Sequence, residues 1–153
     1  MLGEVRIRTK DFAGARAAIE KALAAEPKFV TPYLTLIRLD LTENRMEDSL
    51  QSAGRVLKLV PDLPEAHFYR GLALTSLGRA DEAESSLKVV EASGEAKRFP
   101  RTHFMLGNLL LSRGDIPGAA SQFRKFLVEE PDSRAAEAVR AQLEKWRAEG
   151  SLQ

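Results

Sequence analysis

The sequence predicts an all-α fold, in which antiparallel pairs of helices stack on one another in an α-solenoid. Three observations predict it. Apolar residues recur at helical spacing, glycine or asparagine interrupts them at a regular interval, and prolines close successive segments about 34 residues apart. Because a pair of short helices cannot bury its apolar faces alone, such pairs stack on one another.

Prolines mark the end of each second helix. Pro27 and Pro61 are one period apart, and Pro131 follows Pro61 after two further periods and two extra residues. Proline suits this position because it lacks a backbone donor and disfavours helix in the residue before it. The two extra residues fall in Glu91–Phe99, where the third period has Glu95 instead of proline.

Glycine and asparagine mark the turn between the two helices of each pair. Asn44 and Gly78 are one period apart, and Gly114 follows Gly78 after one period and the same two extra residues. Both residue types tolerate the left-handed backbone conformation that ends a helix. Lys10 holds the same position in the first period, so we expect a less ideal turn there.

Small residues recur inside the helices, at positions where a large side chain would push two antiparallel helices apart. They are Gly71 and Gly107, with Ala15, Ser49, Ala83 and Ala119. Together with the turns and prolines, they predict the helices Val30–Thr42, Arg45–Leu59, Pro64–Leu77, Ala80–Ala92, Arg101–Ser112, Ile116–Glu129 and Arg134–Ala148, in a fold of seven to eight helices.

The best-defined period, residues 100–133, has Leu106-Gly107, Leu110, Gly114-Asp115, Ala119, Phe123 and Pro131 in one register. This pattern resembles the tetratricopeptide repeat, a helix–turn–helix unit of about 34 residues. The resemblance implies that residues 1–153 form a single array, a right-handed superhelical α-solenoid, with Leu2-Gly3 aligned with Leu106-Gly107 inside a first helix. The array then consists of a truncated repeat (1–29), a repeat (30–63), a repeat with a two-residue insertion (64–99), a repeat (100–133) and a capping helix (134–150).

The composition excludes several classes of function. The chain of 153 residues is 44% hydrophobic and 29% charged, with a net charge of +1. No segment is basic enough to indicate a nucleic-acid partner, and the apolar runs are too short for membrane insertion. The absence of cysteine excludes disulfides and thiolate metal sites. A soluble, cytoplasmic protein is favoured for the chain as given, and a removed leader or an upstream region would also fit.

The sequence offers no catalytic, cofactor-binding or metal-binding set, so we do not expect an enzyme. His67 and His103 are the only histidines and occupy equivalent positions of two successive repeats, where the preceding repeat has Tyr33. We interpret both as packing residues. Equivalent positions of neighbouring repeats lie about 10 Å apart, which is too far for two ligands of one metal ion.

Two charged residues depart from the repeat pattern. Asp40 stands where later repeats have Leu74 and Leu110, and Arg70 stands where other repeats have leucine. Because they fall on the first helices of adjacent repeats, we predict a salt bridge between them. The alternative is that each side chain points separately towards solvent.

In the family that the pattern resembles, the first helices line a concave groove, and its inward-facing residues follow helical spacing. We expect Phe68 and Phe104 to provide most of the contact area for a partner, and Arg38, Arg101 and Asn108 to orient it. The alternative occupant is the N-terminal remainder or the C-terminal tail of this or another copy. The expected partner-binding residues are Leu34, Arg38, Leu41, Glu65, Phe68, Leu72, Arg101, Phe104, Asn108 and Leu111.

The resemblance therefore predicts a non-catalytic protein–protein interaction module that binds a peptide or helical segment of another protein. The sequence does not identify that protein. The alternative is an oligomerisation or scaffold fragment of a larger multi-repeat protein, which self-associates through the truncated first repeat at Met1–Thr9.

Overall fold

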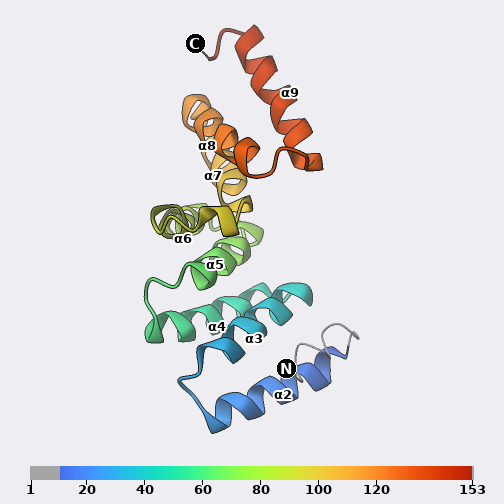
Figure 1. Cartoon of the computed structure of the whole chain (residues 1–153), viewed down its shortest axis with the longest axis vertical. Helices are drawn as coiled ribbons and strands as arrows, with labels where there is room; N and C mark the ends of the chain where they lie inside the picture. The colour runs from blue at the N-terminus through green and yellow to red at the C-terminus, as the bar shows by residue number, and fades with distance from the viewer. Residues whose placement is uncertain (1–10, 153) are drawn as a thin grey trace. The chain divides into compact units, whose positions relative to one another are not determined.

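The computed structural model describes residues 11–152, and within this range it contains eight α-helices and no strand (Figure 1). The expected all-α fold is confirmed. The turn at Lys10 and the edge Met1–Thr9 lie outside the described residues. The helices are α2 (Phe12–Ala25), α3 (Val30–Thr42), α4 (Met46–Leu59), α5 (Pro64–Ser76), α6 (Ala80–Ala92), α7 (Arg101–Ser112), α8 (Ile116–Glu129) and α9 (Arg134–Ala148).

Five of the seven predicted helices have the predicted bounds, and the other two differ by one residue at one end. Arg45 is the N-cap of α4 rather than its first residue, with φ −95° and ψ 69°. Leu77 is the C-cap of α5 rather than its last residue. The insertion forms a 3-10 turn, η1 (Ala96–Arg98), between α6 and α7.

The turns within the helix pairs have the left-handed backbone that the sequence predicts. The φ angles are +60° at Asn44, +72° at Gly78 and +77° at Gly114. In each case the residue after the turn donates its backbone N–H to a carbonyl of the helix that has just ended, as from Arg79 to Leu74 (2.9 Å). The chain can therefore reverse without leaving those carbonyls unpaired.

The second helices begin in two different ways. Asp11 and Asp115 accept the backbone N–H groups of Gly14 and Gly118, each at 2.9 Å. A Cβ atom on Gly118 would lie 2.2 Å from an Asp115 oxygen, so a larger residue there would displace the capping carboxylate. At the equivalent positions of α4 and α6, an arginine instead pairs with the acid three residues later: Arg45 with Asp48 and Arg79 with Glu82, both at 2.7 Å.

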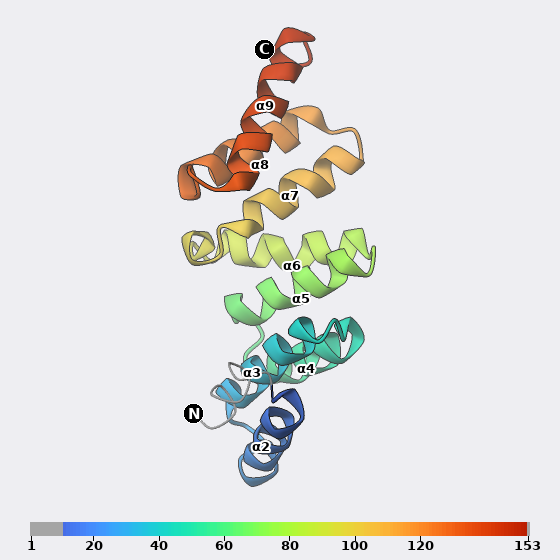
Figure 2. The ribbon, with the colours of Figure 1, turned by 90° about the vertical axis from the view of Figure 1, so that its right-hand side faces the viewer.

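Contacts divide the chain into two compact units, residues 1–86 and 87–153, with the division inside α6. In the first unit, α2 packs on α3 through a buried cluster of Ala15, Ile19, Leu36 and Leu39. A second cluster joins α3 to α4 and the start of α5, and contains Tyr33, Ile37, Ala53, Val56 and Ala66. Figure 2 shows α3 and α4 side by side as one helix pair.

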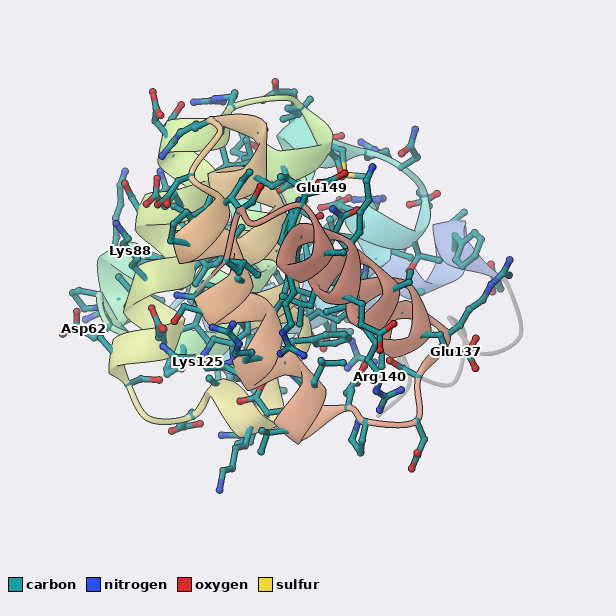
Figure 3. The ribbon with its side chains drawn as sticks, turned by 90° about the horizontal axis from the view of Figure 1, so that it is seen from above. Asp62, Lys88, Lys125, Glu137, Arg140 and Glu149 are labelled. Carbon is teal, nitrogen blue, oxygen red and sulfur yellow. The ribbon has the colours of Figure 1, made fainter. Side chains whose placement is uncertain are left out.

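In the second unit, α7 and α8 form an antiparallel pair and α9 packs on α8. Its core contains Ala119, Ala120, Phe123, Phe126, Ala136, Val139 and Trp146. The Trp146 ring of α9 stacks on Phe123 at 6.1 Å. The opposite face of α9 is polar, and Glu137 and Arg140 point away from the core (Figure 3).

Gly107 explains how closely α7 approaches α8. A Cβ atom on Gly107 would lie 2.4 Å from the Phe123 ring, so only glycine leaves room for it. The prediction that this glycine marks a close approach of two antiparallel helices is confirmed.

Candidate functional site

Six of the expected partner-binding residues lie in the first unit, on the first helices α3 and α5. Leu34 and Leu41 are half-buried and pack against the cluster that contains Tyr33 and Ile37. Arg38 is exposed between them and has no ion-pair partner among the described residues. Apolar surface and an unpaired cation therefore alternate along α3.

On α5, Glu65 and Leu72 are half-buried, whereas Phe68 is only 8% exposed. The Phe68 ring lies 5.6 Å from the ring of Tyr69. Little of the Phe68 ring is accessible to a ligand, because most of its surface is buried. This aromatic residue of the first helix therefore contributes mainly to packing. Leu72 offers more apolar surface.

Tyr69 was missed in the sequence analysis, since it lies one position beyond the inward-facing series. Its hydroxyl donates to Glu65 Oε1 at 3.3 Å. Burial, and then the charge of Glu65, raise the pKa of Tyr69, so the phenol stays protonated and keeps this hydrogen bond. Its spacing of four from Glu65 is the helical signal that could have identified it.

The other four expected residues lie in the second unit, on α7. Phe104 is half-buried, with its ring 5.2 Å from Phe126 and 6.1 Å from Phe123. Leu111 packs at the edge of the same core. Arg101 is exposed and has no ion-pair partner in residues 11–152. The Asn108 amide donates to the Phe104 carbonyl of its own helix at 3.0 Å, so it is held close to α7.

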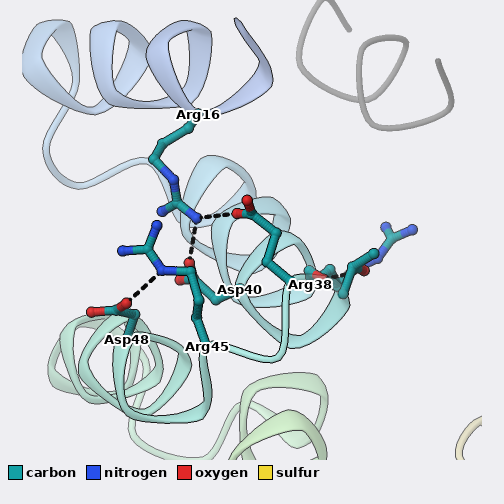
Figure 4. Close-up of polar contacts among 7 residues, drawn as sticks. Arg16, Arg38, Asp40, Arg45 and Asp48 are labelled. Carbon is teal, nitrogen blue, oxygen red and sulfur yellow. Dashed lines mark hydrogen bonds and ion pairs between the residues drawn. The ribbon is translucent and has the colours of Figure 1, made fainter. Parts of the chain in front are cut away.

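The predicted salt bridge between Asp40 and Arg70 is wrong. Asp40 is 1% exposed and pairs instead with Arg16 of α2 at 2.7 Å (Figure 4). Arg16 also reaches Glu43 at 2.6 Å. Arg70 donates to Ser86 Oγ at 3.1 Å and lies 3.7 Å from Glu82. Each residue thus finds a partner on a helix that the comparison of repeat positions did not consider.

The pair between Arg16 and Asp40 is strongly influenced by burial. Burial raises the pKa of Asp40, although the hydrogen bond and charge of Arg16 act in the opposite direction. For Arg16, burial acts to lower the pKa, but the hydrogen bonds to Asp40 and Glu43 raise it overall. One carboxylate oxygen of Asp40, Oδ2, has no hydrogen-bond partner among the described residues.

The two histidines hold equivalent positions but make different contacts. His67 Nε2 lies 2.8 Å from the Pro61 carbonyl, which can only accept, so this nitrogen carries the proton. Tyr33 donates in the same way to the Pro27 carbonyl at 3.1 Å. Both residues therefore attach a first helix to the proline loop before it.

His103 follows a repeat that lacks the closing proline, and it contacts carboxylates instead. It is 5% exposed, with Nδ1 2.8 Å from Glu129 and Nε2 3.7 Å from Glu91. Lys125 and Gln122 of α8 also donate to Glu91, at 2.5 and 3.2 Å. Burial raises the pKa of Glu91, but these hydrogen bonds outweigh it and lower the pKa overall.

Neither histidine belongs to a metal site in the part of the chain that the structure describes, where no group of three or more His, Cys, Asp or Glu residues could hold an ion. In the same part of the chain, every helix is too short or too polar to cross a membrane.

A model of the tetratricopeptide repeat matches residues 34–96, and a second model of this repeat matches residues 100–125. Together they match more than half of the chain. No curated protein matches it.

Several solved structures share the fold. A MamA structure has a TM-score of 0.84 and 21% identity over 98% of this chain and 85% of that one. PilF of Pseudomonas aeruginosa has a TM-score of 0.85 and 19% identity, over 97% of this chain and 67% of PilF. YrrB, described as having an unusual peptide-binding site, has a TM-score of 0.75 and 21% identity, over 91% of this chain and 71% of YrrB. The fold is an all-α solenoid of repeated helix pairs, as the sequence predicts.

Proposed function

Because this chain belongs to the tetratricopeptide repeat family, a family of protein-interaction modules, we propose that it binds a peptide or helical segment of a partner protein along its first helices. The family is typically non-catalytic, and we propose that this chain has no catalytic activity either. The peptide-binding site described for YrrB supports a peptide ligand for the shared fold.

The observation that carries the proposal is the surface of α3 and α5 in the first unit. Leu34, Leu41 and Leu72 keep part of their apolar surface exposed, next to the unpaired guanidinium of Arg38. A ligand segment would place apolar side chains on the leucines and a carboxylate or a backbone carbonyl on Arg38. Glu65, held by Tyr69, bounds this surface with a negative charge.

In the second unit, α7 supplies the remaining residues of the proposal. The half-buried ring of Phe104 and the side chain of Leu111 provide apolar surface, and the exposed Arg101 provides a cation. The Asn108 amide donates one hydrogen to its own helix, so its second N–H and its carbonyl oxygen remain for a ligand.

We also propose the repeat boundaries 1–29, 30–63, 64–99, 100–133 and 134–150. The helix bounds support them, because α3 with α4, α5 with α6 and α7 with α8 each fall within one proposed repeat.

The test is affinity capture from the source cell with the full chain, comparing wild type with Arg38→Glu. Arg38 is exposed and unpaired, so charge reversal leaves the fold intact while it repels a ligand carboxylate. Lys21→Glu is the matched control, since Lys21 of α2 is also exposed and unpaired among the described residues. We expect the captured proteins to be lost with Arg38→Glu and retained with Lys21→Glu. Equal capture by both variants would place the partner elsewhere.

A further inference from the structure

A second candidate site lies in the first unit, beside the second helix α4. It is a cleft of about 770 Å³, which we call the Gly54 cleft. A smaller cleft of about 440 Å³ lies one repeat earlier, against α2. The residues of α2 and α3 that line this smaller cleft are one repeat period before the residues of α4 and α5 that line the Gly54 cleft. The Gly54 cleft is lined by Glu47, Asp48, Leu50, Gln51, Gly54, Leu57, Lys58, His67, Arg70, Leu74 and Arg79.

Three residues of the Gly54 cleft depart from the repeat pattern: Gly54, Lys58 and Arg70. Positions equivalent to Gly54 have charged side chains, positions equivalent to Lys58 have small or apolar ones, and positions equivalent to Arg70 have leucine. The equivalents of Gly54 are Glu20, Lys88 and Arg124. The equivalents of Lys58 are Ala24, Ala92 and Val128, and those of Arg70 are Leu36 and Leu106. Three independent departures therefore converge on one cleft.

Packing does not explain Gly54. A Cβ atom built there meets no atom within 4 Å, whereas one on Gly107 would clash with Phe123. The φ of Gly54 is also not in the left-handed region. Glycine inside a helix weakens it relative to alanine, so its effect here is to leave space free in the cleft.

The cations of the cleft are incompletely neutralised. Arg70 donates to the neutral Ser86 hydroxyl, and its nearest carboxylate, Glu82 at 3.7 Å, is already held by Arg79 at 2.7 and 2.9 Å. Lys58 is exposed and has no ion-pair partner in the described part of the chain. Of the acids in the cleft, Asp48 is paired with Arg45. Asp48 and Glu47 both lie in the first turn of α4, whereas Lys58 lies in its last turn. The end of the cleft at Lys58 is therefore positively charged. The apolar side chains that line the cleft are Leu50, Leu57 and Leu74.

We propose that the Gly54 cleft binds an acidic peptide segment of a partner protein. A carboxylate of the segment lies over Gly54 and pairs with Arg70 and Lys58, and a neighbouring apolar side chain packs on the half-buried Leu50 and Leu57. Charge complementarity selects this occupant, because the lining of the cleft includes these two cations beside apolar side chains. The Gly54 cleft is distinct from the surface of α3 and α5 proposed above and does not depend on it.

The test uses the full chain and an array of capped octapeptides in a Gly/Ser background. Each peptide carries one Asp or Glu at a varied distance from one Leu, Phe or Trp, next to its Asn or Gln counterpart. We expect the acidic peptides to bind at least tenfold more tightly than their amide counterparts, and to weaken as salt is raised. Equal binding of acidic and amide peptides, or no binding of either, would overturn the proposal.

The best acidic peptide is then measured by fluorescence anisotropy with four variants. Arg70→Leu and Gly54→Glu each introduce a residue found at an equivalent position, and each should reduce affinity at least tenfold with helicity unchanged. Lys21→Glu, on α2 and outside both proposed surfaces, is the charge control and should bind within twofold of wild type. Arg38→Glu distinguishes the two surfaces. If Arg38→Glu loses the peptide while Gly54→Glu retains it, the acidic segment binds to the surface of α3 and α5 and this proposal is wrong.

Discussion

Two successive interfaces of the first unit, one between α2 and α3 and the next between α4 and α5, use equivalent positions for opposite chemistry. In the first, Arg16 and Asp40 form an ion pair across the repeats. In the second, the equivalent positions hold Leu50 and Leu74, both lining the Gly54 cleft. The charge of the second interface instead lies on Arg70, one helical turn earlier on α5, and it faces α6 of its own repeat.

In this unit, the buried charge occurs where a neighbouring helix supplies its partner. Asp40 is almost fully buried, and its partner comes from a helix 24 residues earlier in the chain. Where α4 supplies Leu50 instead, position 74 is leucine. A buried ion pair and an apolar pair fill the same place, as expected when neither is clearly superior in free energy.

Breaking the ion pair should have the largest effect. Arg16→Leu leaves the buried Asp40 with no partner, and we expect the free energy of unfolding to fall by roughly 3–5 kcal/mol at neutral pH. Urea denaturation followed by circular dichroism measures this. A loss below about 1 kcal/mol would indicate that the pair behaves like an exposed one.

Converting the first interface into the second should reverse that loss. With Arg16→Leu and Asp40→Leu together, no fully buried charge is stranded, because Glu43, which also loses Arg16, keeps a quarter of its side chain exposed. We expect stability between that of the wild type and about 1–4 kcal/mol above it. A double variant as unstable as Arg16→Leu alone would show that the place cannot accept an apolar pair.

The same double variant should change the pH dependence. Because the pKa of Asp40 is raised in the folded state, its contribution to stability is full below the ordinary aspartate pKa of about 3.9 and is lost as the pH rises through the raised value. Denaturation at several pH values should show this decline in the wild type and its absence in the double variant.

The glycines of the two units extend the comparison, since one is enclosed and the other is open. Gly107→Leu should destabilise by about 1–3 kcal/mol, because the Phe123 ring occupies the space that a side chain needs. Thermal unfolding measures the change. An unchanged melting curve would mean that α7 and α8 do not meet at this residue.

The smallest expected effect has the opposite sign. Gly54→Ala should stabilise by about 0.5–1 kcal/mol, since alanine restricts the unfolded chain and meets no atom in the folded one. The same denaturation experiment measures it. Destabilisation would reveal a packing role for Gly54 and would remove one of the three departures that define the Gly54 cleft.

The sequence by itself determined where the helices lie. Asn44, Gly78 and Gly114 end first helices because their backbone angle is a local property of the residue, and prolines act through the residue next to them. The repeat period then places all seven predicted helices to within one residue. The same local logic predicted the close approach at Gly107, since a small residue at a fixed register is visible without coordinates.

Only the tertiary structure decided which side chains meet. Comparison of equivalent positions paired Asp40 with Arg70, because both depart from leucine, but the reach of Arg16 from α2 depends on how two helices pack. The carboxylates around His103 and the small exposed fraction of Phe68 depend on packing in the same way. Helix formation is governed by neighbours in the sequence, whereas pairing, burial and open space are governed by neighbours in space.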